Sequence, residues 1–553
     1  MFEREQLKTM LRNIAETRKT IMVISGPRQS GKTTAVGQML DRCGIPAFEY
    51  SADNIVSEGN EWIIECWESA RNRMDALQQK EAILVIDEVQ KIKGWSEAVK
   101  KEWDHDTRKR RNLKVVLLGS SRLLLQKGLE ESLAGRFEKI DMPYWSYDEM
   151  HDAFGMTRDE YIYFGGFPGL YEYIKDETRW RSFMESSIVS PFLQKDITLI
   201  EEIRNPTLMS RVFAVASAYS AKEIAINSMQ TELNSGTNPT ISNYLSLLDK
   251  TMMVKPLFKY RNKEEKKNNS APKMQVYNNG FLSVNRNTIL QEVRSDNTNW
   301  GQWIESAVGA HLLNMSTKHG YEVMYWREKL KYKDKQGKTR EGTFEVDFVL
   351  RKGCSVVAIE VKSNRAKQLS GITEFRKLFN ENNEDRLTST LVVGNQGLTF
   401  EEFCRLDLNR LFQGKSIDSE MKEAVPSSRL DMGQKKQLEL IGRINGTVWL
   451  DGDDYIIQKN KSGELVKMRS RDVNESLEEN TPEILKEMGL NKKNIIQEFA
   501  KGHTISVGQL KLYYDINTRS IEEGMTYEEA LYRQKCKEKE PEKNLMRKIG
   551  IKL

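Results

Sequence analysis

Residues 21–34 read IMVISGPRQSGKTT, and this stretch decides the fold of the first part of the chain. Four apolar residues, typical of a buried strand, run into Gly26-x-x-x-x-Gly31-Lys32-Thr33, which matches the pattern of a phosphate-binding loop. The glycines allow backbone N–H groups to face one concavity that a side chain would obstruct. The positive end of the helix expected next also attracts an anion. The stretch therefore predicts a strand, an anion-binding loop and a helix.

Further apolar runs follow at 82–87, 113–118 and 137–142, with polar stretches of helix length such as 59–79 and 95–110 between them. Strands that alternate with helices predict an α/β domain with a mostly parallel sheet. The carboxyl ends of such strands meet at one edge of the sheet, where ligands bind. Asp87-Glu88 and Gly119-Ser120-Ser121 end two of these runs, so we expect their side chains beside the loop.

This edge of the sheet carries the residue types that ATP hydrolysis needs. We expect Lys32 to reach the β- and γ-phosphates, and Thr33 and Asp87 to hold Mg²⁺. Glu88 is expected to polarise the attacking water. Ser120 is a candidate sensor of the γ-phosphate, and an ordinary turn is the equal alternative. The expected nucleotide-binding residues are Gly26, Pro27, Arg28, Gln29, Ser30, Gly31, Lys32, Thr33 and Thr34.

Composition sets outer limits on the rest of the chain. At about 150 residues per domain, 553 residues predict three or four domains. No apolar run is long enough for a membrane span and no signal peptide opens the chain, so a cytoplasmic location without membrane contact is expected. The net charge of +5, from 85 basic and 80 acidic residues, is too small for a general polyanion attractant. The five scattered cysteines and five histidines argue against a disulfide framework and a structural zinc site.

Several segments in a specific order resemble a known family. GPRQSGKTT, DEVQ, LLGSS, SLAGRF, MPYWS and GGFPGL look like AAA-type ATPases of bacteria and archaea that carry a winged helix and then a C-terminal restriction-endonuclease-like domain. The resemblance covers about residues 1–410. It implies that Arg136 stabilises transition-state charge, in its own or a neighbouring subunit; a surface salt bridge is the alternative. Relatives often have Thr-Gly-Ser at 119–121, so the role of Ser120 departs from the family pattern.

We expect the following organisation from the patterns and the resemblance together. An AAA-type core spans 1–145, a helical lid 146–200, a winged-helix-like domain 201–262, a linker with connecting strands 263–300, a nuclease-like α/β domain 301–412, a linker 413–434, and a C-terminal α+β module 435–553. In that module, 447–468 predicts a β-meander, and Thr481-Pro482 predicts the start of a helix. The sequence does not indicate the function of this module. One hypothesis for the chain is that the module recruits a protein partner.

A second set of polar residues lies in the nuclease-like segment. Glu345 and Asp347 share one face of a strand, and Glu360 and Lys362 share a face of the next. The short connection predicts an antiparallel pair that brings Asp347 beside them. Carboxylates at the edge of an apolar sheet need a cation, and Mg²⁺ fits.

The spacing D-x12-E-x-K resembles the PD-(D/E)XK nuclease core. In this interpretation Asp347 and Glu360 hold the metal, Lys362 orients or deprotonates the nucleophile, and Glu305 on the preceding helix is a further ligand. A degenerate or purely structural domain is the alternative. His311, on the same helix as Glu305, is expected to be a core histidine.

Contact with nucleic acid would depend on local basic clusters at 108–111, 263–273 and 329–340, although such clusters are usually solvated faces. The candidate recognition helix at 240–249 has no Lys or Arg and leaves Asn243 for base reading, so DNA binding through the backbone is favoured. Alternatively, the winged helix only packs between the ATPase domain and the nuclease-like domain.

The leading hypothesis for the whole chain is an ATPase that drives a Mg²⁺-dependent nuclease-like domain on DNA. The alternative is a nucleotide-dependent switch or scaffold for a protein partner, and a homo-oligomer stays open in both.

Overall fold

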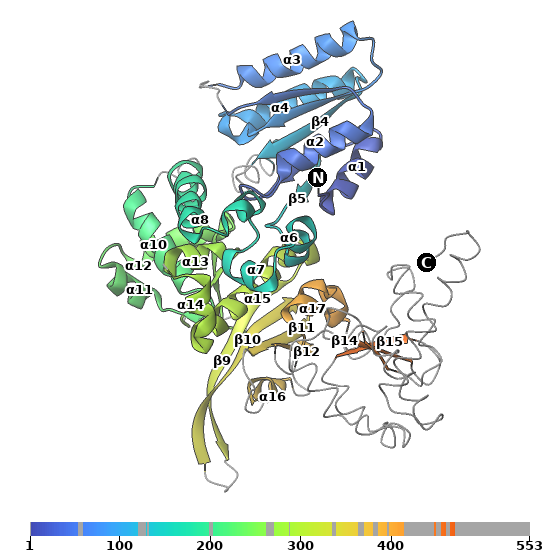
Figure 1. The fold of residues 1–553 in the computed structure, drawn as a ribbon. Helices are drawn as coiled ribbons and strands as arrows, with labels where there is room; N and C mark the ends of the chain where they lie inside the picture. The colour runs from blue at the N-terminus through green and yellow to red at the C-terminus, as the bar shows by residue number, and fades with distance from the viewer. Residues whose placement is uncertain are drawn as a thin grey trace, which may run out of the picture. The chain divides into compact units, whose positions relative to one another are not determined.

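The structure is a computed structural model, and it divides the chain into two compact units, 1–414 and 415–553 (Figure 1). It describes residues 2–53, 59–119, 129, 132–197, 203–261, 270–286, 288–333, 339–362, 370–379, 385–394, 397–413, 447–449, 455–459 and 465–469.

The N-terminal part of the first unit contains a five-stranded parallel sheet with the order β2-β3-β4-β1-β5. Strands β1 (Ile21–Ser25), β3 (Ala82–Asp87), β4 (Leu113–Gly119) and β5 (Phe137–Asp141) confirm the four apolar runs and the parallel α/β sheet expected from the sequence. The edge strand β2 (Ala47–Ser51) was not predicted. Only Phe48 of this strand is buried, so no continuous apolar run marks it.

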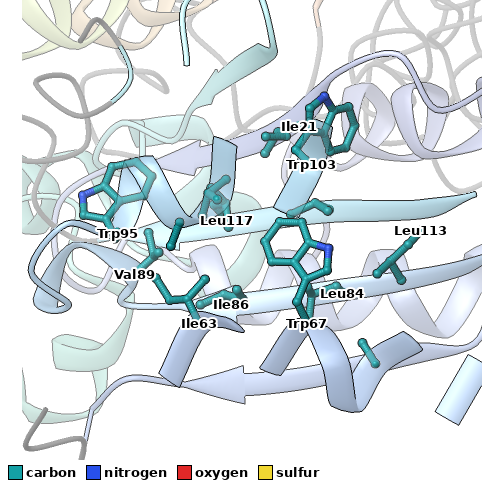
Figure 2. Packing of buried hydrophobic residues seen from close by; sticks show 14 of the residues in the cluster. Ile21, Ile63, Trp67, Leu84, Ile86, Val89, Trp95, Trp103, Leu113 and Leu117 are labelled. Carbon is teal, nitrogen blue, oxygen red and sulfur yellow. The ribbon is translucent and has the colours of Figure 1, made fainter. Parts of the chain in front are cut away.

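Helices cover both faces of this sheet because its strands are apolar on both sides. On one face, α1 (Gln6–Ala15) and α2 (Lys32–Cys43) pack against Met22, Ile24 and their neighbours. On the other, α3 (Glu61–Ala76) and α4 (Trp95–Arg108) pack against residues that alternate with these. Figure 2 shows Trp67, Trp95 and Trp103 in this second layer, together with Ile86 and Leu117. With both faces buried, the strand ends are where the sheet can meet a ligand.

A helical segment follows the sheet. It consists of α6 (Tyr147–Phe154), α7 (Arg158–Phe164), η2 (Pro168–Tyr173), α8 (Glu177–Phe183), η3 (Met184–Val189) and η4 (Phe192–Asp196). Ser146 and Thr157 each begin a helix with a capping box, in which the side chain accepts the N–H of a glutamate that bonds back to the cap. α7 ends at Gly165, whose φ of +73° favours glycine, and this break agrees with the glycines and proline at 165–169.

The next segment combines helices with a small sheet. It contains α10 (Pro206–Ala218), α11 (Ile226–Leu233) and α12 (Asn238–Lys250), and its antiparallel sheet has the order β6-β8-β7, from β6 (Lys222–Glu223), β8 (Lys273–Val276) and β7 (Val254–Leu257). Two helices follow, α13 (Gly280–Arg286) and α14 (Leu290–Ser295). Every residue of β8 is buried. The stretch expected as a linker with connecting strands therefore contributes the central strand of a sheet.

The last segment of the first unit is built around the long helix α15 (Asn297–His319) and a four-stranded sheet with the order β12-β11-β10-β9. Its strands are β9 (Glu322–Lys333), β10 (Thr339–Lys352), β11 (Ser355–Lys362) and β12 (Arg386–Gly394). β10 pairs antiparallel with β11, as predicted, and β11 pairs parallel with β12. The connection between β11 and β12 contains α16 (Ser370–Arg376), and α17 (Phe400–Arg405) and α18 (Leu408–Phe412) end the segment.

In the second unit the described residues form an antiparallel sheet of β13 (Thr447–Trp449), β14 (Tyr455–Lys459) and β15 (Leu465–Arg469). This confirms the β-meander predicted at 447–468. The helix expected to start at Pro482 lies outside the described residues. Across the parts of the chain that the structure describes, no helix is both long and apolar enough to span a bilayer.

Candidate functional site

The loop at 26–31 follows β1 and is shaped by two glycines. A Cβ on Gly26 would lie only 2.1 Å from the carbonyl oxygen of Met142, so no larger residue fits. Gly31 has a φ of +84° and starts helix α2. The other residues expected to bind the nucleotide lie in this loop or in the first turn of α2; they are Pro27, Arg28, Gln29, Ser30 and Thr34. The local backbone therefore has the form that the sequence predicts.

Lys32 places its ammonium group over the loop instead of in solvent. The side chain is largely buried, and its Nζ donates hydrogen bonds to the carbonyl oxygens of Gly26, at 3.0 Å, and Pro27, at 2.9 Å. These carbonyls belong to the same loop whose N–H groups are expected to face a phosphate. The lysine is thus held at the loop, where a phosphate oxygen can replace the carbonyls as its partner.

Thr33 and Asp87 meet although they belong to different elements. The Thr33 hydroxyl, in the first turn of α2, lies 3.3 Å from Oδ2 of Asp87, at the end of β3. The other carboxylate oxygen of Asp87 accepts the backbone N–H of Glu88 at 2.8 Å, which fixes its orientation. A hydroxyl and a carboxylate oxygen in contact beside a glycine-built loop fit Mg²⁺, which prefers such oxygen ligands.

Glu88 follows directly and adopts a left-handed backbone, with a φ of 53°. Non-glycine residues in this conformation are uncommon and often occur at functional sites. The buried amide of Gln90 donates to the Glu88 carboxylate and so holds it next to Asp87. Ser120, the expected γ-phosphate sensor, lies outside the described residues.

Arg136 is at the opposite end of the sheet from this site, which corrects the expectation that it serves its own phosphate loop. Its carbonyl accepts the N–H of Ile21, the first residue of β1, whereas the loop follows the last residue. A strand of 5 residues separates the two ends by about 16 Å. The Arg136 guanidinium instead forms a bidentate pair with Asp104 on α4, at 2.9 and 3.1 Å. Within one chain, Arg136 therefore forms a surface salt bridge, which was the alternative interpretation of this residue.

Arg4 is a contact of the loop that sequence reasoning missed. Its side chain is only 4% exposed, and one nitrogen donates to the carbonyls of Ser30 and Pro143, both at 2.9 Å. The same guanidinium holds both carboxylate oxygens of Glu149 on α6, at 2.8 and 2.9 Å. The indole N–H of Trp145 donates to the same Ser30 carbonyl. No local pattern marks a lone arginine near the N-terminus, and only its partners reveal that it ties the loop to α6.

A second site is a pocket of about 510 Å³ whose wall carries carboxylates from three elements, and one of them, Glu223 of β6, accepts a hydrogen bond from Arg327 at 2.9 Å. Glu305 comes from α15, and Glu345 and Asp347 come from β10. Lys222 and Arg327 line the same pocket. The structure therefore brings Glu305 and Asp347 together, as the sequence indicated.

Lys273 supplies a cation to these carboxylates. The side chain is 1% exposed and forms an ion pair with Glu305; its Nζ lies 3.8 Å from Glu345 and 3.9 Å from Oδ1 of Asp347. It also donates to the Asp347 carbonyl at 3.2 Å. Burial alone would lower the pKa of Lys273, but the attraction of Glu305, Asp347 and Glu345 outweighs it and raises the pKa. The ammonium is therefore charged.

The remaining predicted residues lie beside this cluster. Oδ2 of Asp347 accepts the Val361 N–H at 2.7 Å, which joins β10 to β11, and Glu360 pairs with Lys362 at 2.6 Å. Burial opposes charge on Lys362, but its hydrogen bond to Glu360 raises its pKa overall. No group of three or more His, Cys, Asp or Glu in the described ranges is arranged to hold a metal ion. The sequence reasoning did not include Lys273, which provides a cation beside Glu305 and Asp347, and the metal site stays a prediction.

The position of Lys273 depends on how closely β8 packs against α15. A Cβ on Gly309 would lie 2.2 Å from the Gln275 amide oxygen and 2.7 Å from a ring carbon of Phe348, so both buried side chains would have to move to accommodate it. Gln275 in turn donates to the Ser306 carbonyl at 2.8 Å. This contact sets Lys273 alongside Glu305 on the same helix. The sequence places Lys273 at the end of a charged stretch, which suggested a solvated basic cluster and concealed its burial.

His311, on the same helix α15, is a core residue, as expected. It is buried, its ring packs against Phe403, and burial lowers its pKa to about 4.

Three segments of the chain match protein families. Residues 18–151 match an AAA domain, residues 157–292 a domain of unknown function, DUF8612, and residues 300–407 a domain of unknown function, DUF4143. The first match contains the glycine loop, Thr33 and Asp87 with the geometry described above. The chain carries a P-loop ATPase domain. The two other families add no activity to this conclusion.

Individual relatives are distant. The chain is 24% identical over 287 residues to the uncharacterized proteins Mb2031c of Mycobacterium bovis and Rv2008c of Mycobacterium tuberculosis, covering 51% of this chain and 59% of each relative. The match thus spans about three fifths of the length of these curated relatives. Among solved structures, the Walker-type ATPase PABY2304 of Pyrococcus abyssi aligns with a TM-score of 0.37 and 16% identity, covering 52% of this chain and 96% of that one. A chain from work on katanin self-assembly aligns with a TM-score of 0.20 and 20% identity, covering 27% and 48%.

Proposed function

We propose that the domain at residues 18–151 binds ATP with Mg²⁺ and hydrolyses it. The observation that carries this proposal is the meeting of Thr33 and Asp87, 3.3 Å apart, beside the loop held by Lys32. Such a hydroxyl and carboxylate are the expected ligands of the ion, and Mg²⁺ neutralises charge on the β- and γ-phosphates when bound. Glu88, oriented by Gln90, accepts a proton from the attacking water.

We further propose that nucleotide state is passed from the loop to the segment at 300–407. Arg4 links the Ser30 carbonyl to Glu149 of α6, and Asp148 of the same helix pairs with Arg405 of α17 at 3.0 Å. The Tyr144 N–H also donates to Asn314 of α15, at 3.3 Å. A shift of the loop on phosphate binding would therefore act on α6 and, through it, on the later segment.

For that segment we favour the role of a nucleotide-dependent switch or scaffold that engages a protein partner. The order α15-β9-β10-β11-α16-β12, with the Asp347, Glu360 and Lys362 set, supports a nuclease-like fold. The order α10-β6-α11-α12-β7-β8 likewise supports a winged helix before it. The ion pair of Lys273 with Glu305 favours the switch, because it gives the carboxylates a partner without a metal. A Mg²⁺-dependent nuclease acting on DNA is the second candidate, supported by the juxtaposition of Asp347 and Glu360.

Matched variants test the ATPase proposal. Lys32→Ala should abolish ATP binding, whereas Glu88→Gln should bind ATP and lose turnover. Lys19→Ala, an exposed lysine at the far end of β1, serves as the matched control and should retain full activity. Equilibrium binding of a fluorescent ATP analogue and phosphate release measure the two effects. Unchanged hydrolysis in Lys32→Ala would overturn the proposal.

The second candidate has its own assay. Metal-dependent cleavage of single- and double-stranded DNA by the full chain, lost in Asp347→Asn, would favour the nuclease. Absence of cleavage in the wild type, under conditions where ATP is hydrolysed, supports the switch.

A further inference from the structure

The carboxylates of the second-site pocket, the acidic pocket, are paired with a cation that belongs to the chain, a buried lysine that is not itself among the lining residues. Lys273 contacts carboxylates of three residues, Glu305, Glu345 and Asp347, and donates to the Asp347 carbonyl oxygen. The ring of Phe348 lies 5.0 Å from its Nζ and adds a cation–π contact. Carboxylate and carbonyl oxygens arranged around one point are the ligands a divalent cation would use. Here they surround an ammonium group.

The ammonium is anchored and not easily withdrawn. Lys273 starts the central strand of the β6-β8-β7 sheet, and that strand packs against α15 through Gln275 and Gly309. Its side chain is only 1% exposed, so the ammonium is held away from solvent. A buried ammonium removed from its carboxylates would lose the main compensation for its desolvation. The lysine is therefore part of the core of this region.

The positive charges already present beside this pocket make it unlike a metal centre. A divalent ion between Glu305 and Asp347 would be within a few ångströms of the Lys273 ammonium, and like charges at that distance in a buried site repel strongly. The nearby Glu360 already pairs with a second lysine, Lys362. Each of these carboxylates thus has an ammonium partner from the chain.

We infer that Lys273 is the resident cation of the acidic pocket's carboxylates and takes the place of a divalent metal between Glu305 and Asp347. The segment at 300–407 then works without a divalent ion in this pocket. This inference does not rest on ATP hydrolysis, and its test uses no nucleotide.

Direct binding of Mn²⁺ to the full chain tests the inference, with free Mn²⁺ measured by electron paramagnetic resonance. The wild type should show no Mn²⁺ site that Asp347→Asn removes. Lys273→Met, which keeps most of the unbranched side chain and removes the charge, should gain one such site, and adding Asp347→Asn should abolish it. Lys222→Met is the matched control, because Lys222 lines the same pocket and is attracted by Glu305 only at longer range, without an ion pair in the described geometry, and it should gain none. A wild-type site that Asp347→Asn removes would overturn the inference, as would a folded Lys273→Met without a gained site.

Thermal unfolding keeps the test decisive where Lys273→Met folds poorly. The variant should melt at a lower temperature than the wild type, because its carboxylates are unpaired. Either Mn²⁺ or the added pair Glu305→Gln and Asp347→Asn should recover most of the loss, whereas Mn²⁺ should not raise the melting temperature of the wild type beyond that of its Asp347→Asn variant. If neither treatment rescues Lys273→Met, the lysine has a role other than that of a cation, and the inference fails.

Discussion

The hydroxyl of Thr33 lies 3.3 Å from a carboxylate oxygen of Asp87, although 54 positions separate the two residues in the chain. The distance is short because β4 alone lies between β1 and β3, and both parallel strands end at the same edge of the sheet. The loop after β1 leads into α2, and Thr33 in the first turn of this helix faces Asp87. Strand order thus brings together the two residues of the proposed Mg²⁺ site, which are remote in sequence.

Replacing Thr33 tests this relationship. Thr33→Val keeps the shape of the side chain and removes the hydroxyl, so the rate of ATP hydrolysis should fall about 100-fold, with a higher Mg²⁺ requirement. Thr33→Ser keeps the hydroxyl and should stay near the wild-type rate. Steady-state hydrolysis measured across a Mg²⁺ titration distinguishes them. An unaltered Mg²⁺ requirement in Thr33→Val would separate the hydroxyl from the ion.

Arg4 should position the phosphate loop and not only stabilise the fold. Arg4→Gln leaves Glu149 without its buried partner and should reduce the free energy of unfolding by about 3 kcal/mol. The double variant Arg4→Gln with Glu149→Gln should recover part of that stability but keep a raised KM for ATP, because the Ser30 carbonyl has lost one of its two donors and keeps only the Trp145 indole. Chemical denaturation and KM measured on the same samples separate the two effects. A wild-type KM for ATP in the double variant would show that Arg4 only stabilises the fold.

Arg136 should not affect its own ATP site. Arg136→Ala should leave ATP affinity unchanged and cost less than about 1 kcal/mol of unfolding free energy, because its pair with Asp104 is partly exposed. If a neighbouring subunit uses this arginine, turnover per chain should rise with protein concentration in the wild type and stay flat in the variant. Loss of activity in dilute, monomeric Arg136→Ala would contradict the separation of about 16 Å along β1.

His311 should make the fold sensitive to acid. It is buried against Phe403, and burial lowers its pKa to about 4 from an ordinary 6.5. Because protonation then favours the unfolded chain, stability from the neutral ring is complete above pH 6.5 and decreases as the pH falls toward 4. The loss amounts to about 3 kcal/mol. Urea unfolding at pH 7 and pH 4.5 should show this decrease in the wild type and a smaller one in His311→Leu. Equal acid losses in both would contradict it.

Any DNA binding should follow the phosphate backbone. Lys329 and Lys331 are exposed on β9, whereas Lys273, from another basic cluster, is buried and unavailable. The logarithm of the affinity should decrease with the logarithm of salt concentration by about 0.9 per phosphate contact. Lys329→Gln with Lys331→Gln should reduce that slope by about 2 for any DNA sequence. Fluorescence anisotropy across a salt series measures the slope. No affinity at low salt would leave the protein-partner switch as the remaining candidate.

Elements that are marked by a local pattern of apolar residues could be predicted from the sequence. Elements and contacts that depend on packing between segments remote in the chain could not. β1, β3 and β4 are apolar on both faces and were located to within a residue or two. β2 is an edge strand with a single buried residue, and it was missed. The pairing of Asp347 with the Glu360 strand was predictable because a short turn fixes the hairpin register. The ion pair of Lys273 with Glu305 was not predictable, because the burial of Lys273 depends on the packing of β8 against α15. No spacing of residues along the chain indicates that contact.

The acidic pocket draws its charges from both sides of a family boundary. Lys273 belongs to the segment at 157–292, whereas Glu305 and Asp347 belong to the segment at 300–407. A fragment cut at residue 300 would keep the acids and lose their ammonium. Metal affinity measured on such a fragment would be an artefact of the cut, and a domain swap made at this boundary would need Lys273 transplanted as well.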